Sequence, residues 1–560
     1  MAIETRARRG SEEIPSGDDG APPRKGLLSH RAVYGYGPLV AFVVLFVLMA
    51  ALLPSVVAPG EAETTSGETQ KSAEELGLGG EATEATEGTE GQRGRQGAGP
   101  TTVTIPATTE GCPARDDQIP GDPYSPPCIV FTGDNGGATS RGVTKDTIVV
   151  AARILNEKGF QQTLAALAGA EIVDSPPDVQ RTISAYEKYI NERFEFYGRK
   201  IKIVFYKGKG SGTTELLGGG QAEAQADAIH VAQNIKAFIE MNAGSAPFQE
   251  ALSRQKVLAF GTPYLSREWH LSHRPWNWGI APDCDTVAEA AAEIYVKQMA
   301  GKPADLAGPG LKGKMRKVSG LSPENPWYQV CHDSAIRLIE AAGHDAGIKI
   351  NYRLDIPSFS NQAANVVAKL KDEGVTTILC GCDPVFPVFL TSKAAEQDYN
   401  PEWINLGTAG TDLDIVGQLY NQDQWSRAFG VSHLGEQLPQ RAGLGYAAYK
   451  TVRDDEPAFA NEIIYSNMYM IALGLQLAGP NLTPETFEKG IFTYPPKTGP
   501  FGTWTFGPND YTPPYDTRYI WWDPEKVSIF NGKKGAYVES YGGKRFAPGS
   551  IPAGDPQAFK

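Results

Sequence analysis

The chain has 560 residues and a formal net charge of -13 at pH 7. A single hydrophobic core stops growing at roughly 250–300 residues, so we expect more than one packed unit together with non-globular segments. Nucleic acids bind clusters of Lys and Arg, and the acidic balance therefore excludes a nucleic-acid partner from our prediction.

An apolar segment near the start, residues 37–58, contains no charged residue and is long enough to cross a membrane. Arg and Lys residues precede it, so the positive-inside rule places residues 1–36 in the cytoplasm and everything after the segment outside. We predict a single-pass anchor in the cell membrane. The alternative is a cleaved signal sequence, because Val56 and Ala58 suit a cleavage site, although Pro59 follows directly.

Residues 59–110 are dominated by Gly, Glu, Thr and Ala and contain almost no large apolar residue. Such a composition cannot offset the entropy cost of ordering the chain. We therefore predict a disordered linker, with a partner-binding role for its acidic repeats as the alternative.

All six cysteines follow the apolar segment, where an oxidising compartment permits disulfides. Cys112 and Cys128 bracket a Pro-rich stretch with little core of its own, so we predict a disulfide between them. The spacing of Cys380 and Cys382 is similar to metal or redox motifs, but it is not the CxxC of thiol oxidoreductases. For these two and for Cys284 and Cys331 we favour bridging or burial and leave the pairing open.

From residue 144 onward, short β-branched runs alternate with amphipathic stretches, a pattern typical of parallel strands joined by helices. The first series predicts strands at 147–152, 200–206, 236–241 and 257–260 and helices at 177–193, 221–234 and 246–254. After a helix at 286–299, the second series predicts strands at 316–320, 349–354 and 376–380 and helices at 326–342, 361–373 and 386–397.

These two series predict an α/β fold of two Rossmann-like lobes separated by a cleft. Ligands of open parallel sheets bind beyond the carboxyl ends of the strands, so the cleft is the predicted ligand site, and lobe closure is the predicted binding motion. The predicted boundaries are 111–543 for the whole domain, 144–282 and 434–482 for lobe 1, 283–433 and 483–530 for lobe 2, and 544–560 for a flexible tail.

Four stretches, in this order along the chain, carry a resemblance to a known family: residues 141–150 (RGVTKDTIVV), 186–206, 358–379 and 498–510 (TGPFGTWTFGPND). Together they resemble the branched-chain amino acid binding proteins, which are type I periplasmic receptors of ABC importers. The resemblance covers about residues 142–523. It implies two lobes joined by three crossings, a small ligand held in the cleft, and the permease subunits of an ABC transporter as partners.

The resemblance also implies positions for ligand contacts. The turn of Asn242, Gly244 and Ser245 follows the third strand, where the free N–H groups of a helix N-terminus attract a ligand carboxylate. Gly261 and Thr262 follow the fourth strand and line the same pocket. Each polar residue has an alternative role as a helix cap.

In lobe 2 the resemblance implies that Trp327 and Tyr328 cover the ligand and that Asp383 and Asp412 accept a ligand ammonium group. Trp327 has an alternative role in the core, and either Asp in capping the following helix.

Other motifs give no support to catalysis. The glycine-rich residues 208–212 lack the last glycine of a dinucleotide-binding loop and are predicted to form a mobile loop. His270 and His273 lack a third metal ligand. Cys331 and His332 are adjacent, so on a helix they point apart and do not form a nucleophile-base pair. We predict no enzyme, no cofactor and no metal.

The predicted function is an extracytoplasmic solute-binding protein of an ABC-type importer that captures a small polar solute, such as an amino acid or a related amide or carboxylate. The alternatives are a membrane-tethered ligand sensor and, less favoured, an enzyme on a similar fold. Residues 1–36 are too few for a cytoplasmic signalling domain, which weighs against the sensor.

Overall fold

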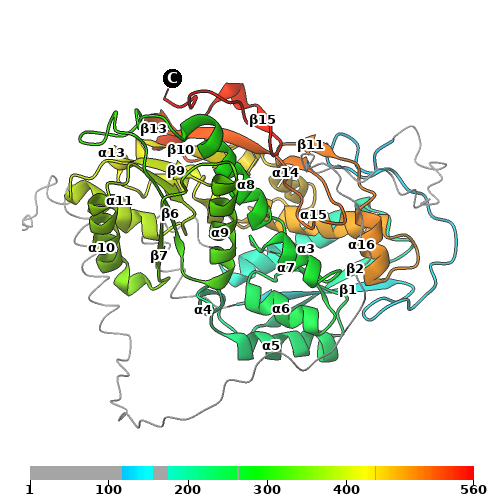
Figure 1. Ribbon diagram of the computed structural model, residues 1–560. Helices are drawn as coiled ribbons and strands as arrows, with labels where there is room; N and C mark the ends of the chain where they lie inside the picture. The colour runs from blue at the N-terminus through cyan, green and yellow to red at the C-terminus, as the bar shows by residue number, and fades with distance from the viewer. Residues whose placement is uncertain (1–115, 156–173, 262–263, 436, 560) are drawn as a thin grey trace, which may run out of the picture. The chain divides into compact units, whose positions relative to one another are not determined.

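The structure, a computed structural model, describes residues 116–155, 174–261, 264–435 and 437–559 (Figure 1). The predicted cytoplasmic segment (1–36), anchor (37–58) and linker (59–110) all lie outside these residues. Within the described ranges, no helix is both long enough and apolar enough to span a membrane.

Lobe 1 is built on a five-stranded sheet whose paired strands are all parallel, in the order β2-β1-β3-β4-β5. Its first strand is buried along most of its length, as strands of parallel sheets covered on both faces are. The strands are β1 (Thr147–Ile154), β2 (Lys200–Lys207), β3 (Ile239–Glu240), β4 (Leu258–Phe260) and β5 (Asn277–Trp278). The helices that follow them are α3 (Pro176–Arg193), α4 (Gly212–Leu216), α5 (Gln221–Ile229), α6 (Ala246–Arg254) and α7 (Arg267–Ser272).

Lobe 2 is built on an eight-stranded sheet with β14-β13-β10-β9-β8-β6-β7 in order and β15 paired with β13. The parallel part comprises β6 (Val318–Pro323), β7 (Ile348–Tyr352), β8 (Thr377–Cys380), β9 (Glu402–Asn405) and β10 (Ala428–Ser432). An antiparallel part adds β13 (Thr517–Val527), β14 (Lys534–Glu539) and β15 (Arg545–Phe546). The main helices are α8 (Cys284–Ile294), α9 (Pro326–Ala341), α10 (Phe359–Asp372) and α11 (Phe386–Glu396).

The chain passes between the lobes three times: between β5 and α8, between β10 and α14, and between β12 and β13. On its return to lobe 1 it forms α14 (Leu444–Lys450), α15 (Asn461–Leu477), α16 (Pro484–Ile491) and the hairpin β11 (Lys497–Gly499) and β12 (Gly502–Trp504). The predicted α/β fold with two parallel-sheet lobes is confirmed, and so are the three crossings.

One lobe boundary was wrong. We assigned residues 483–530 to lobe 2, but Phe487, Trp504 and Tyr511 are buried in the core of lobe 1. The ring of Phe487 lies so close to α15 that a Cβ on Gly474 would be 1.9 Å from it. This contact fastens α16 to lobe 1, and the chain returns to lobe 2 only with β13.

The predicted flexible tail, residues 544–560, was also wrong for its described part. β15 pairs with β13, and Phe546, Ile551 and Ala558 are buried in a hydrophobic core of lobe 2. Lys297 of lobe 2 donates hydrogen bonds to the carbonyl oxygens of Gly549 and Ile551. Strand pairing and apolar burial therefore hold the tail in place.

Two disulfides join cysteines of lobe 2, which confirms the preference for structural bridging. Cys284 at the start of α8 is bonded to Cys331 in α9, and Cys380 is bonded to Cys382. Cys128 is buried and disulfide-bonded. Cys112, its predicted partner, lies outside the described residues, so that pair stays a prediction.

Candidate functional site

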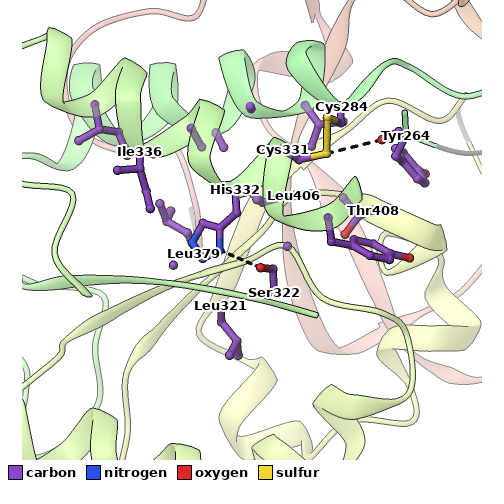
Figure 2. Close-up of a pocket in the computed structure, with 18 of the residues that line it drawn as sticks. Tyr264, Cys284, Leu321, Ser322, Cys331, His332, Ile336, Leu379, Leu406 and Thr408 are labelled. Carbon is purple, nitrogen blue, oxygen red and sulfur yellow. Dashed lines mark hydrogen bonds between the residues drawn. A yellow bond between two sulfur atoms is a disulfide. The ribbon is translucent and has the colours of Figure 1, made fainter. Parts of the chain in front are cut away.

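An apolar pocket lies in lobe 2 between α8, α9 and the ends of β6, β8 and β9 (Figure 2). Its walls are mostly alkyl groups, among them Val287, Ala335, Leu321, Leu379 and Leu406. The cavity volume is about 50 Å³. A single water needs about 10–15 Å³ measured in this way, so the pocket has room for a few waters or a short alkyl group.

Small residues keep this space open. α8 is rich in alanine, and Ala288 and Ala291 line the pocket where larger side chains would fill it. The Cys284–Cys331 disulfide ties α8 to α9 along one wall. On the sheet side, Gly320 in β6 has no side chain, and a Cβ there would lie 1.8 Å from Nε2 of His332.

Four residues of the pocket lining carry hydroxyl groups: Tyr264, Ser322, Tyr328 and Thr408. Tyr264 comes from lobe 1, where it follows β4, and its carbonyl oxygen lies 3.5 Å from Sγ of Cys331. Burial raises the pKa of both tyrosines, and the nearby carboxylates of Asp412 and Asp383 raise it further. The phenols are therefore protonated at neutral pH and can both donate and accept hydrogen bonds.

His332 places one imidazole in the pocket wall. Its Nδ1 lies 2.7 Å from Oγ of Ser322, which also accepts a hydrogen bond from Nε2 of Gln329 (Figure 2). Among the described residues, its buried Nε2 has no hydrogen-bond partner. Burial lowers the pKa of His332 to about 4, so the ring is neutral at pH 7. A buried polar atom without a partner is uncommon, and it can be satisfied by a ligand.

The turn predicted to receive a ligand carboxylate is occupied by the protein itself. The Ser245 hydroxyl accepts from the N–H of Phe248 as the N-cap of α6 and donates to the carboxylate of Glu215. Asn242 donates from Nδ2 to the carbonyl oxygen of Arg153 at 3.0 Å. Of the turn residues, Gly244 is exposed to solvent.

The turn after β4 is likewise engaged within lobe 1. The carbonyl oxygen of Gly261 accepts from Nε2 of Gln249 at 2.6 Å. The φ of Gly261 is +133°, and a Cβ there would lie 3.0 Å from the carbonyl oxygen of Ala243, so glycine suits this position. Thr262 lies outside the described residues.

The two predicted acids are buried near the pocket tyrosines, Asp412 near Tyr264 and Asp383 near Tyr328. Asp383 accepts from the N–H groups of Val385 and Phe386 at the start of α11 and from the hydroxyl of Tyr352, so it caps that helix. Asp412 accepts from the Ser432 hydroxyl at 2.6 Å, and burial raises its pKa to about 6. Its other oxygen, Oδ1, has no hydrogen-bond partner among the described residues.

Of the predicted residues, Tyr328 lines the pocket, and Trp327 is partly buried one position earlier in α9. Sequence reasoning did not single out the pocket roles of Tyr264, Thr408 or His332. Thr408 follows β9, so the rule that polar residues after buried strands line the site points to it. His332 had been weighed only as half of a nucleophile-base pair, and the disulfide at Cys331 excludes that pair.

No group of three or more His, Cys, Asp or Glu residues suited to a metal ion occurs in the described part of the chain.

Comparisons with known proteins give one family match. The sequence pattern of a family described as periplasmic binding protein matches residues 169–523. No curated protein of similar sequence was found. A solute binding protein of an ABC transporter from Rhodopseudomonas palustris HaA2, in complex with p-hydroxybenzoic acid, has a similar structure, with 13% identity and a TM-score of 0.50, covering 72% of this chain and 98% of that chain.

Two further solved structures are similar. The solute binding protein from Rhodopseudomonas palustris BisB5, in complex with 3,4-dihydroxybenzoic acid, gives 13% identity, a TM-score of 0.50 and coverage of 72% of this chain and 98% of that chain. The leucine-, isoleucine-, valine-, threonine- and alanine-binding protein from Brucella ovis gives 14% identity, a TM-score of 0.49 and coverage of 73% and 98%. At these identities the two structures with a TM-score of 0.50 show the fold alone.

Proposed function

Because the chain belongs to the periplasmic binding protein family, we propose that it is the solute-binding component of an ABC-type importer and captures a small solute by closing its two lobes. The observation that supports this most is the composition of the pocket. Tyr264 of lobe 1 meets Cys331, Tyr328 and Thr408 of lobe 2 there, so a solute in the pocket contacts both lobes at once. A solute that binds only the closed arrangement shifts the lobes toward it.

The lining favours a compact solute with an alkyl part and one polar head. The alkyl walls suit the first, and the hydroxyls of Tyr264, Tyr328 and Thr408 suit the second. An amino acid or a related amide or carboxylate would need to bind its head group away from Ser245, because the Ser245 hydroxyl already donates a hydrogen bond to Glu215.

The proposal extends to location and partners. Residues 37–58 would anchor the protein in the cell membrane, residues 59–110 would tether the binding domain outside the cytoplasm, and the permease subunits of the importer would receive the closed, loaded form. The two disulfides of lobe 2 are consistent with an oxidising compartment.

Thermal unfolding of the full-length chain, purified in detergent to accommodate the proposed anchor, tests the proposal. The probes share one alkyl group and differ in the head: valine, isobutyramide, isobutyric acid and isobutanol, with 4-hydroxybenzoate as an aromatic comparison. A bound solute must raise the unfolding midpoint in a saturable way. We expect at least one probe to do so.

Tyr328→Ala should abolish that stabilisation, whereas Tyr446→Ala should preserve it, because the Tyr446 hydroxyl bonds to Glu456 away from the pocket. Stabilisation that survives Tyr328→Ala would contradict the assigned pocket. Chemical turnover of a probe without any stabilisation would contradict the receptor function and favour the enzyme.

A further inference from the structure

A cluster of buried charged side chains closes the carboxyl edge of the lobe 1 sheet. Arg153 in β1 is 4% exposed, and the carboxylates of Glu215 and Asp227 that contact it are 1% and 2% exposed. The guanidinium donates to the two oxygens of Glu215 at 3.0 and 2.5 Å, and one of its nitrogens lies 2.8 Å from Asp227. A bidentate contact of this kind is the strongest geometry between arginine and a carboxylate.

The carboxylate of Glu215 lies at the N-terminus of α6. The Ser245 hydroxyl, which caps that helix, donates to it. The guanidinium carbon of Arg153 lies 4.1 Å from the centre of the Phe248 ring in the first turn of α6. A guanidinium, a hydroxyl and the positive end of a helix together form a complete site for one carboxylate. Glu215 supplies that carboxylate from within the chain.

The segment that carries Glu215 is short and partly exposed to solvent. α4 contains five residues and is followed by Leu217 and Gly218. The side chains of Leu216, its last residue, and Leu217 are 43% and 45% exposed. Gly218 and Gly220 have φ values of +92° and +73°, which glycine tolerates without strain. The buried carboxylate of Glu215 is therefore a fixed point of this segment in the core of lobe 1.

The same segment touches lobe 2. A Cβ on Gly218 would lie 3.0 Å from Nδ2 of Asn325 and 3.4 Å from the ring of Trp327, both at the start of α9. In Figure 1, α4 lies on the side of lobe 1 that faces α9 and β7. The bound carboxylate is therefore carried by a segment that reaches from the edge of the lobe 1 sheet to the start of α9 in lobe 2.

We propose that the turn between β3 and α6 is an anion site that the chain fills with its own Glu215, and that this internal ligand excludes solute carboxylates from lobe 1. The effect on specificity rests on the proposed function, whereas the occupied site does not. It follows that the solute presents an uncharged head to lobe 1 and that α4 determines this preference.

Removal of Glu215 alone tests the proposal, because Arg153 has a second carboxylate partner in Asp227. Asp227 also contacts Arg153, and it accepts hydrogen bonds from the N–H groups of Lys209 and Gly210. Without Glu215, Arg153 keeps one carboxylate partner and remains buried beside an empty space of carboxylate size. A small carboxylate from solution can then restore the missing contacts.

The experiment is chemical rescue of Glu215→Ala in the full-length chain. Thermal unfolding is followed at constant ionic strength in chloride, formate and acetate. We expect the variant to unfold several degrees below the wild type in chloride and to regain most of that difference with formate or acetate, in a saturable way. The wild type and Glu215→Gln, whose side chain still fills the space, should not respond.

Absence of rescue would overturn the proposal and reduce Glu215 to a fold-stabilising residue. If the variant does not fold in chloride, refolding in acetate against chloride gives the same test, and equal yields would overturn it. Glu402→Ala is the matched control, because Glu402 is 0% exposed and pairs with Arg316 at 2.8 and 2.9 Å in lobe 2. Equal rescue of that variant would show only a general response of buried arginines and would also overturn the proposal.

Failure of the proposed function can be told apart from failure of the occupied anion site, because the rescue experiment is carried out without any solute or transporter. A chain that binds no probe but shows rescue keeps the occupied anion site and loses its role in solute specificity.

Discussion

The two lobes have the same kind of sheet edge, formed by the carboxyl ends of parallel strands, yet different side chains lie at the two edges. At the edge of lobe 1, the Arg153 guanidinium already contacts two carboxylates, those of Glu215 and Asp227. At the edge of lobe 2, the pocket beside His332 is lined mostly by alkyl groups, and among the described residues the buried Nε2 of His332 has no hydrogen-bond partner. Both lobes share parallel-sheet topology, so the side chains of the segments that follow the strands make the two edges chemically different.

The largest expected effect comes from breaking the lobe 1 edge. Arg153→Met leaves the buried carboxylates of Glu215 and Asp227 without their cation, which costs about 3–5 kcal/mol of unfolding free energy. Urea denaturation measures it. Arg254→Met is the control, because Arg254 pairs with Glu250 on the surface, where such pairs contribute about 0–1 kcal/mol. Similar losses for both variants would contradict the assigned role of the cluster.

Two disulfides cross-link lobe 2 and are expected to contribute to its stability. Cys284 and Cys331 are 47 residues apart in sequence, and Cys380 and Cys382 only 2. Constraint of the unfolded chain predicts a stabilisation of about 4 kcal/mol for the first bridge and about 1.5 kcal/mol for the second. Urea denaturation of the two double Cys→Ala variants compares them. A larger loss for the short bridge would show that constraint of the unfolded chain does not govern this wall.

The pH dependence of stability sharpens the description of lobe 1. Burial raises the pKa of Glu240 from 4.5 to about 7, so the folded state binds a proton that the unfolded state releases between these values. The free energy of unfolding should therefore fall as pH rises from about 4.5 to 7, by about 3 kcal/mol from this residue. Glu240→Gln keeps an acceptor for the N–H groups of Arg153 and Asn242 and removes the proton.

The wild type and Glu240→Gln should differ in slope within that window and run parallel above pH 7. Other titrating groups contribute equally to both proteins and cancel in the comparison. Identical slopes in urea titrations across the window would show that Glu240 is already ionised in the folded state.

The smallest effect on stability is expected from filling the pocket. Ala335→Leu adds methylene groups to a wall that borders empty space, so we expect the unfolding free energy to change by less than about 1 kcal/mol. Solute affinity should fall at least tenfold. Ala394→Leu is the control, since Ala394 is fully buried in the lobe 2 core away from the pocket and overpacking there costs about 1–3 kcal/mol. Equal destabilisation by both changes would mean that the pocket is closed in solution.

The repeated units of each lobe could be predicted because their signals are local. The predicted helical face of Val179, Ile183, Tyr186 and Ile190 is buried or partly buried in α3. The predicted strand at 236–241 was longer than β3, because Lys236 has a φ of 57° and ends the preceding π-helical turn. Propensity indicates that an element exists more reliably than where it begins.

The antiparallel part of lobe 2 could not be predicted in the same way. β13 pairs with β10, which lies far away in sequence, and with β14 and β15 near the end of the chain. No short-range signal indicates the pairing of β13 with β10 or β15, which is why the sequence predicts a flexible tail at residues 544–560. Similarly, Phe487 belongs to lobe 1 through a contact with α15 that only the fold reveals.

The contacts of the predicted site residues also depend on segments that are distant in sequence. The family resemblance pointed to Ser245 and Tyr328, which lie at the N-terminus of α6 and in the first turn of α9. Neither the resemblance nor the position after a strand could show that the Ser245 hydroxyl donates a hydrogen bond to Glu215, which lies 30 residues earlier in the sequence. Residues 208–212, predicted to form a mobile loop, have backbone N–H groups bonded to Asp227 and belong to the same cluster. Charge compensation between distant segments is invisible to local patterns.

The central claim is that the solute enters the lobe 2 pocket beside His332 and leaves the lobe 1 edge unchanged. NMR of the protein with isotope-labelled histidine side chains tests this most directly. The signal that is missing from the His332→Asn variant is assigned to His332. We predict that a stabilising solute shifts the His332 signal with the same midpoint as the thermal stabilisation, while buried His270 of lobe 1 does not respond. Saturating stabilisation with an unchanged His332 signal would contradict the account.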